Sequence, residues 1–381
     1  MARVRIGVDV GSTGVRAAEL SVGSDPPALV RAAQVPLSPG AVVDGEVKQP
    51  DAVTEAIKEL WQRGGFRSKE VTMGVGNQRV VVREVTVPSI PPKELRQSLP
   101  FQVGELIPIP MEDAVLDYDV LEEFDQEDAR MVRLLVVAAQ REMVDTMVQT
   151  AVNAKLRPIG VDLVPFALVR SVGTSDGLGL EEADAGGEAV VDVGADVTNI
   201  CVHERGVAKF VRILPSGGHD VTTAMASSLG IPEEEAEALK RGTPVEGVLP
   251  AEGVPPAEGV PPAEGVPGEG VPPGEGTPSP ETARQILDAR ASVLVDEIRS
   301  SFDFYQAQSP GARVSRVLVT GGSSKLPGLL EMIGDRVRAQ VEPGHAFSKV
   351  RPQLAMDEET MAEAEPLLAV AIGLALPEVT R

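Results

Sequence analysis

Hydrophobic and polar positions alternate along the first part of this chain and change to a helical spacing in several later segments. Residues 4–37 alternate around glycine turns, which predicts a strand meander. We also expect strands at 71–87, 114–122, 131–139 and 207–214. Apolar residues at three- and four-residue intervals predict helices at 51–61, 93–106, 142–153, 162–172, 220–229, 233–240, 282–308, 325–337 and 362–376. This mixture of strands and helices predicts an α/β protein.

Two segments far apart in the chain share one pattern, which is an apolar strand, an aspartate, a glycine turn and a second apolar run. They are 6–16, with Asp9, and 189–199, with Asp192. A glycine after a strand lets the backbone approach a ligand closely, and successive N–H groups in such a turn bind anions. A carboxylate at a strand end can hold a hydrated magnesium ion. One such turn is also compatible with an ordinary hairpin, but two copies predict the halves of a clamp for a nucleoside triphosphate.

A third segment, 316–328, has an apolar strand, the pair Gly321-Gly322 and an expected helix start. Glycines without side chains allow a base or ribose to pack on the backbone, and the N-terminus of a helix favours negative charge. This pattern occurs in many α/β proteins, so it supports the clamp without proving it.

Composition and charge narrow the classes of protein that are possible. The 381 residues are 43% hydrophobic but only 3% aromatic, so we expect two or more domains with aliphatic cores. A formal net charge of -22 argues against binding to nucleic acid or to an anionic membrane surface. No apolar run is long enough to span a bilayer, so we expect no direct membrane insertion. Cys201 is the single cysteine and fits a reducing cytoplasm.

Residues 243–280 have low complexity, with a repeated unit Gly-Val-Pro-Pro-Ala-Glu. Such a segment offers too little apolar surface to offset the entropy of ordering. We expect a flexible, acidic tether within the second half of the chain; a partner motif of the polyproline type is the alternative.

These patterns together resemble the actin/Hsp70-type ATPase superfamily and, within it, the PilM family of type IV pilus assembly proteins. The resemblance covers nearly the whole chain except the tether. The segments that look most like this family are 92–95, 107–110, 116–118, 135–142 and 301–306, the last in front of the Thr320-Gly321-Gly322 turn. The related division protein FtsA shares the clamp but typically ends in a membrane-binding helix, which we do not find here.

The resemblance implies a two-lobe actin-like ATPase fold of the α/β class, made of ribonuclease H-like repeats, with a small inserted α+β subdomain. The expected division is a first lobe at 1–87, the inserted subdomain at 88–160, the rest of the first lobe and the crossover at 161–187, the second lobe at 188–242, the tether at 243–280, the second lobe again at 281–348 and a return to the first lobe at 349–381.

The resemblance also implies ATP and Mg²⁺ as cofactors, with Asp9 and Asp192 at the metal. The residues that would contact the nucleotide are Asp9, Gly11, Ser12, Thr13, Arg16, Asp192, Gly194, Thr198, Asn199, Gly217, Gly218, Glu237, Lys240, Gly321, Gly322 and Ser323. Arg16 stands where relatives often have lysine. Glu237 and Lys240, three apart on one helical face, match ribose and adenine contacts, although a solvated ion pair is an equal alternative.

One position departs from the family pattern. Relatives usually carry Glu or Gln just before the helix expected at 162–172, where it positions the attacking water, whereas this chain has Val164. A valine cannot orient or deprotonate water, so we expect slow hydrolysis or none. A shift of two residues would give the catalytic role to Asp162.

The implied function is that of an ATP-binding cytoplasmic scaffold of the pilus assembly platform, whose nucleotide state changes a protein-binding surface. Its expected partner is the cytoplasmic N-terminal segment of a PilN-like protein, docked on apolar residues within 95–121, and pilus motor ATPases are further candidates. The scaffold would lie at the inner face of the cytoplasmic membrane through these partners. Two alternatives are a small-molecule kinase of the same superfamily, for which no sugar-binding set is evident, and an Hsp70-like chaperone lobe.

Overall fold

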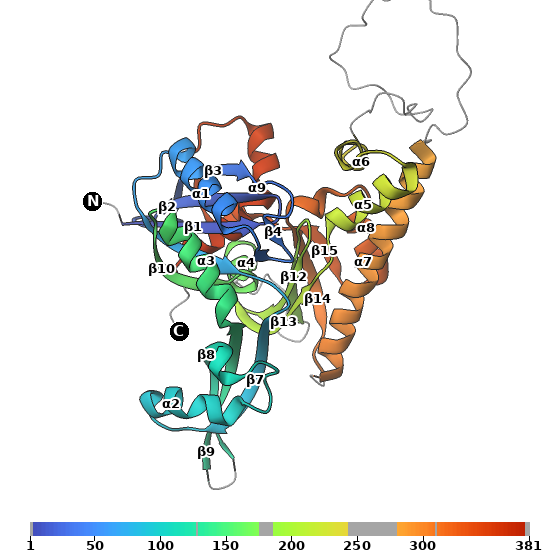
Figure 1. Cartoon of the computed structure of the whole chain (residues 1–381). Coiled ribbons are helices and arrows are strands. Elements are labelled where there is room, and N and C mark those ends of the chain that lie inside the picture. The colour runs from blue at the N-terminus through green and yellow to red at the C-terminus, as the bar shows by residue number, and fades with distance from the viewer. Residues whose placement is uncertain (1–2, 127–128, 175–185, 243–279, 309–310, 378–381) are drawn as a thin grey trace, which may run out of the picture.

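The structure of this chain is a computed structural model that describes residues 3–126, 129–174, 186–242, 280–308 and 311–377. The tether predicted at 243–280 lies outside the described residues, apart from its last position. Two lobes lie side by side, each built on one β-sheet, and a smaller third sheet extends from them (Figure 1).

The first lobe contains a six-stranded sheet in the order β10-β6-β1-β2-β3-β16. Its strands are β1 (Val4–Gly11), β2 (Gly14–Ser21), β3 (Ala28–Pro36), β6 (Glu70–Val75), β10 (Arg157–Leu163) and β16 (Arg351–Pro352). The antiparallel pairing of β1, β2 and β3 confirms the predicted meander. Helix α1 (Pro50–Gly64) packs on β3 and on α3 (Arg141–Asn153), and α9 (Glu358–Ala375) packs on β1 and β2.

The second lobe contains a five-stranded sheet in the order β13-β12-β11-β14-β15. Its strands are β11 (Gly187–Val193), β12 (Thr198–Glu204), β13 (Val207–Leu214), β14 (Val314–Thr320) and β15 (Gln340–Pro343), and its helices are α5 (Gly218–Leu229), α6 (Glu233–Lys240), α7 (Pro280–Gln308) and α8 (Leu329–Arg336). The helix predicted at 325–337 is shorter than expected. Pro327 and Gly328 separate α8 from the 3₁₀ turn η2 (Gly322–Lys325).

Both lobes begin with the same arrangement of strands. In the first lobe β1 pairs antiparallel with β2 and parallel with β6. In the second lobe β11 pairs antiparallel with β12 and parallel with β14. The two similar sequence segments therefore form equivalent hairpins, one in each lobe.

The third sheet has the order β7-β9-β8, from β7 (Val80–Pro88), β8 (Ala114–Gln126) and β9 (Ala129–Gln140). Helix α2 (Pro92–Val103) covers one face of it with Leu95 and Leu99, which are buried against Leu134. This sheet begins at Val80, before the boundary expected at 88. Helix α3 and the first four residues of strand β10, which fall within 88–160, pack instead with the first lobe. The division of the chain into domains stays a prediction.

Helix α4 (Val164–Ser171) lies between the lobes and contacts β10 and β6 on one side and β11 and β12 on the other. The helix predicted at 162–172 begins two residues late, because Asp162 and Leu163 complete strand β10. Pro158 and Gly160 obscured that strand in the sequence, since both residues are uncommon inside strands.

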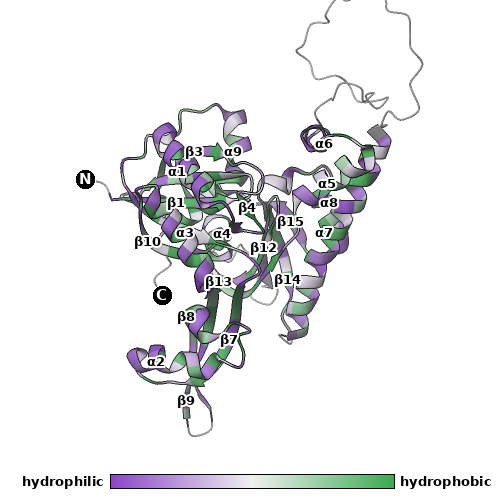
Figure 2. Cartoon of the chain, in the orientation of Figure 1, coloured by the Kyte–Doolittle hydropathy of each residue, from purple (hydrophilic) through white to green (hydrophobic). Residues whose placement is uncertain are grey.

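The cores are mainly aliphatic, as the scarcity of aromatic residues predicts. Hydrophobic residues concentrate in the strands of the two large sheets, and hydrophilic ones lie on outward sides of the helices (Figure 2). Among the described residues, no helix has the length and apolar character needed to cross a bilayer. The smaller elements are β4 (Val42–Val43), β5 (Glu46–Val47), η1 (Met111–Asp113) and η3 (Ala346–Lys349).

Candidate functional site

The first candidate loop is the tip of the β1–β2 hairpin, between Gly11 and Gly14. Asp9 and Arg16 are paired across this hairpin, with Arg16 Nη1 3.4 Å from Asp9 Oδ2. The buried guanidinium also donates to Gln34 Oε1 at 3.2 Å and to Thr13 Oγ1 at 3.3 Å. Arg16 is therefore held at the base of the loop by three acceptors.

The second candidate loop joins β11 to β12. Asp192 and Asn199 are paired across this hairpin in the same register as Asp9 and Arg16 in the first. Asn199 Nδ2 donates to Asp192 Oδ2 at 3.0 Å, so an amide takes the place of the guanidinium. Thr198 Oγ1 donates to the Ser216 carbonyl at 2.7 Å and ties this loop to the segment before α5.

The two hairpins bring Asp9 and Asp192 close enough for their charges to interact. Burial raises the pKa of Asp192 to about 6; the Asn199 hydrogen bond opposes that rise, the negative charge of Asp9 adds to it and Arg16 opposes it. Burial also raises the pKa of Asp9, against the lowering effect of Arg16. Buried Asp192 and partly buried Asp9 thus lie within reach of each other's charge, and among the described residues Arg16 of β2 is the cation that acts on both.

The third candidate segment, the double glycine after β14, packs directly on the second loop. Gly321 has φ +94°, and a Cβ on it would stand 2.5 Å from Asp192 Oδ1. Ser323 Oγ donates to the Gly194 carbonyl at 2.8 Å, and Gly218 N donates to the same carbonyl at 3.0 Å. The three second-lobe loops therefore form one connected surface around Gly194.

Glu237 and Lys240 of α6 form a buried arrangement rather than a solvated ion pair. Lys240 is 7% exposed, and its Nζ lies 2.5 Å from Glu237 Oε2 and donates to Thr222 Oγ1 at 2.8 Å and to the Gly218 carbonyl at 3.0 Å. Burial alone would raise the pKa of Glu237, but hydrogen bonds from Lys240 and Thr222 lower it to about 2. Burial lowers the pKa of Lys240. This cluster fixes α6 against the Gly217-Gly218 turn.

Asp162 forms an ion pair that includes neither Asp9 nor Asp192. Its Oδ2 forms an ion pair with Arg170 of α4, and Arg170 Nε also donates to the Gly373 carbonyl of α9 at 3.0 Å. Val164 instead approaches the site, since a Cβ on Gly76 would stand 3.0 Å from both Val164 Cβ and Asn199 Oδ1. Asn199 Oδ1 is buried and has no hydrogen-bond donor among the described residues.

A triphosphate with a magnesium ion fits the residues that the loops bring together. Magnesium is commonly held by one or two carboxylates with phosphate oxygens and water, so two carboxylates suffice. In the described part of the chain, no three or more His, Cys, Asp or Glu side chains gather to hold a metal by themselves. A cation would relieve the repulsion between Asp9 and Asp192. Asn199 Oδ1 could accept a hydrogen bond from a donor group on the bound ligand.

The structure brings most of the predicted site residues together, namely those of the two hairpins, the Gly217-Gly218 turn, Glu237 and Lys240 of α6, and Gly321-Gly322. Asp162 is instead paired with Arg170. Sequence reasoning missed Gln34, Gly76, Arg170 and Thr222. The spacing of Thr222 four residues after Gly218, on the helix that starts there, was the one local signal available. The other three are brought in by tertiary contacts alone.

The sequence of this chain matches the models of two known protein families. Residues 7–251, more than half of the chain, match the family described as type IV pilus assembly protein PilM. The chain belongs to the PilM family. Residues 189–373 also match the family of the cell division protein FtsA.

A solved structure described as the PilM-PilN type IV pilus biogenesis complex contains a chain 26% identical to this PilM-family member. The match covers 97% of both chains, with a TM-score of 0.77. MreB5 of Spiroplasma citri bound to ADP shows the same fold at 11% identity, with a TM-score of 0.52 and 97% and 94% coverage. These likenesses confirm the predicted two-lobe actin-like fold.

Among curated relatives, the cell division protein FtsA of Bacillus subtilis (strain 168) is 21% identical over 255 residues. That match covers 62% of this chain and 57% of FtsA, so the chain spans a little over half the length of this relative. Family membership and the actin-like fold are thus shown for this chain.

Proposed function

We propose that this chain binds ATP with Mg²⁺ between its two lobes. The observation that carries the proposal is the pair of carboxylates, buried Asp192 and partly buried Asp9, at equivalent strand ends of the two hairpins. The metal supplies the positive charge that shields the phosphates and both carboxylates. Backbone N–H groups of the hairpin turns hold the phosphates, as they do in other glycine turns.

The remaining second-lobe residues define the nucleoside end of this proposed site. The Gly321-Gly322 turn packs closely on Asp192 and on Leu367 of α9, and we propose its backbone as the wall that contacts the nucleoside. Glu237 is partly exposed, and its Oε1, which accepts from the exposed Arg241 Nε at 2.8 Å, has a second lone pair that suits a ribose hydroxyl. Lys240 holds Glu237 in place from beneath.

We expect ATP turnover to be slow or absent. Val164 occupies the position next to Gly76 and Asn199, and its side chain cannot orient an attacking water. Asp162 as the catalytic residue stays a prediction, and its carboxylate is already engaged by Arg170. Nucleotide would then act mainly as a ligand that selects a lobe arrangement.

The proposed partner is the cytoplasmic N-terminal segment of a PilN-like protein, in keeping with the described content of the similar complex. Within 95–121 the side chains of Leu95 and Leu99 are used in the core of the third sheet. Phe101 and Leu106 are 89% and 52% exposed and are the residues we propose for contact with this segment. Such docking would hold the chain at the inner face of the cytoplasmic membrane. Pilus motor ATPases are further proposed partners.

Helix α4 offers a route by which nucleotide binding would affect partner binding. Arg170 ties it to the first lobe through Asp162 and Gly373, whereas Thr174 N and Oγ1 donate to Glu188 of β11 at 2.7 and 2.8 Å. A nucleotide that contacts both lobes changes their equilibrium by its difference in affinity for the two arrangements.

The test is a titration of the purified chain with ATP, with and without Mg²⁺, for the wild type and Asp9→Ala, followed by titration of a PilN-like N-terminal peptide in each state. We expect Mg²⁺-dependent ATP binding that Asp9→Ala weakens at least about tenfold, a loss typical for a charged contact. Peptide affinity is expected to differ between the two nucleotide states. No ATP binding at millimolar concentration would remove the nucleotide part of the proposal and leave the pilus adaptor role.

A further inference from the structure

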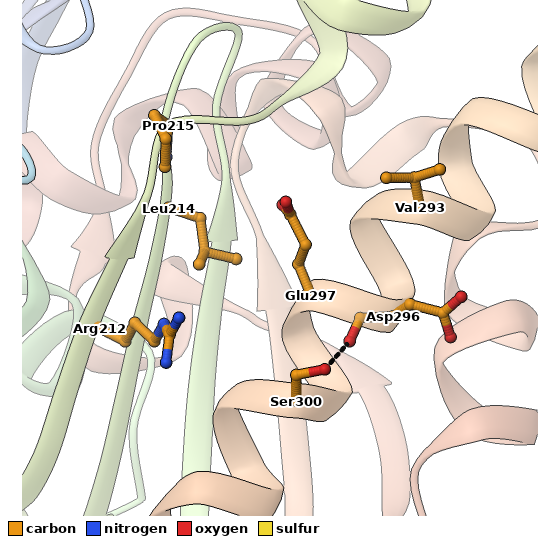
Figure 3. Close-up of a pocket in the computed structure, with 7 residues that line it drawn as sticks. All are labelled: Arg212, Leu214, Pro215, Val293, Asp296, Glu297 and Ser300. Atoms are coloured by element: carbon orange, nitrogen blue, oxygen red, sulfur yellow. Dashed lines mark hydrogen bonds between the residues drawn. The ribbon is translucent and has the colours of Figure 1, made fainter.

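The second lobe has an open groove that the nucleotide site does not use. It lies between β13 and the middle of α7, with a volume of about 380 Å³ (Figure 3). Its lining residues are Arg212, Leu214 and Pro215 on one side and Val293, Asp296, Glu297 and Ser300 on the other. None of them belongs to the proposed nucleotide contacts or to 95–121.

The groove is bordered by apolar side chains that are left uncovered. Val293 is 52% exposed, and Phe304, one of the few aromatic residues of this chain, is 43% exposed. Val293, Glu297, Ser300 and Phe304 follow at intervals of four, three and four residues, so they share one face of α7. The Phe304 ring also lies 6.1 Å from that of Phe210 on β13. The exposed face of α7 therefore has an apolar residue at each end, Val293 beside the groove and Phe304 below it, with Glu297 and Ser300 between them.

The charges of the groove favour a cationic occupant. Glu297 extends into the middle of the groove, and its carboxylate has no hydrogen bond or ion pair with any described residue. The neighbouring Asp296, by contrast, is paired with Arg336 of α8. Arg212 stacks on Phe304, with its guanidinium 5.8 Å from the ring centroid. The formal net charge of -22 adds a field that attracts positive groups to this carboxylate.

We propose that this groove docks a segment of another protein, which places an aliphatic side chain between Leu214 and Val293 and a Lys or Arg against Glu297. The aliphatic side chain would cover Val293, and the cation would neutralise the unpaired carboxylate. A second copy of this chain is a poor occupant because both copies carry the same large negative charge. Residues 243–280 of this chain contain no Lys or Arg and so supply no cation for Glu297.

The experiment uses the full chain and a displayed library of linear peptides as the probe. Enriched peptides are synthesised and their affinities measured for the wild type, Val293→Asp and Glu297→Lys. Val152→Asp on α3 and Glu331→Lys on α8 are the matched controls, since Val152 is 43% exposed and Glu331 is an exposed acid outside the groove. Asp9→Ala is included to separate this surface from the nucleotide site.

We expect enriched peptides to carry Lys or Arg within two residues of an aliphatic side chain. Val293→Asp and Glu297→Lys should each weaken their binding at least tenfold, whereas the two controls and Asp9→Ala should leave it within twofold. Added salt should weaken wild-type binding, because part of the affinity is electrostatic. The proposal would be overturned if no specific peptide is recovered, or if the recovered peptides bind Val293→Asp with the same affinity as the wild type.

Discussion

Asp192 Oδ1 lies 2.5 Å from the point where a Cβ on Gly321 would stand, so a carboxylate of one loop rests on the backbone of another. Gly321 combines this close approach with a φ of +94°, a backbone conformation that residues other than glycine rarely adopt. Glycine is therefore needed at position 321 for two reasons, which are the close contact with Asp192 and the positive φ of its own turn.

Gly321→Ala should lower the free energy of unfolding and weaken ATP binding. A methyl group there would displace Asp192, in addition to a cost of about 1–3 kcal/mol for a backbone conformation that is almost exclusive to glycine. Gly206→Ala is the control, because Gly206 has φ +81° with nothing within 4 Å of its added Cβ. We expect urea unfolding to show a loss in both variants and ATP titration to show a loss in Gly321→Ala alone. Equal affinity in both would contradict the contact.

ATP binding in the presence of Mg²⁺ should strengthen as pH rises through about 6. The pKa of Asp192 is raised from 3.8 to about 6, and a cation binds the ionised carboxylate. Below that pH the affinity should fall by up to about tenfold per pH unit, as protons compete for one site. Calorimetric titrations at several pH values would measure this, and Asp192→Asn should bind weakly with a flatter profile.

The same raised pKa gives the ligand-free protein the opposite dependence. A carboxyl group with a higher pKa in the folded than in the unfolded state stabilises the fold below the unfolded value of 3.8, and that contribution is lost as pH rises through about 6. We therefore expect Asp192→Asn to abolish a decline in unfolding free energy between these pH values. A decline of the same size in the variant would assign it to other groups.

Lys240→Met should destabilise the second lobe by about 1–3 kcal/mol, because it removes a buried cation from Glu237 and a donor from the Gly218 carbonyl. Arg241→Ala is the matched control. Arg241 contacts Glu237 from a side chain that is 73% exposed, so its loss should cost at most about 0.5 kcal/mol. Urea denaturation of both variants would separate a buried pair from a solvated one, and equal effects would favour the solvated pair.

Val164→Gln should raise ATP turnover by about tenfold or more, because it places a polar group beside Asn199 where water needs orientation. Asp162→Ala should leave the residual turnover unchanged and lower stability, since Arg170 would lose its partner. Phosphate release and urea unfolding measure the two effects. Loss of turnover in Asp162→Ala, with none gained in Val164→Gln, would return the water-positioning role to Asp162.

Local patterns alone predicted the parts of this protein that depend on near neighbours in the chain. The sequence predicted the two hairpins with Asp9 and Asp192 and the double glycine before Ser323. Turn-forming residues and strand alternation act over a few positions, so these elements could be recognised locally. The resemblance carried by these motifs correctly indicated the PilM family and the actin-like fold.

The tertiary structure decided what these residues contact. It buried Lys240 beneath Glu237, paired Asp162 with Arg170, and placed Val164 beside Asn199 of the other lobe. The burial of Lys240 and the placement of Val164 depend on elements distant in sequence, whereas the Asp162–Arg170 pair depends on the angle between the adjoining elements β10 and α4. Burial and pairing of this kind follow from the packing of whole lobes, and no spacing within one segment encodes them.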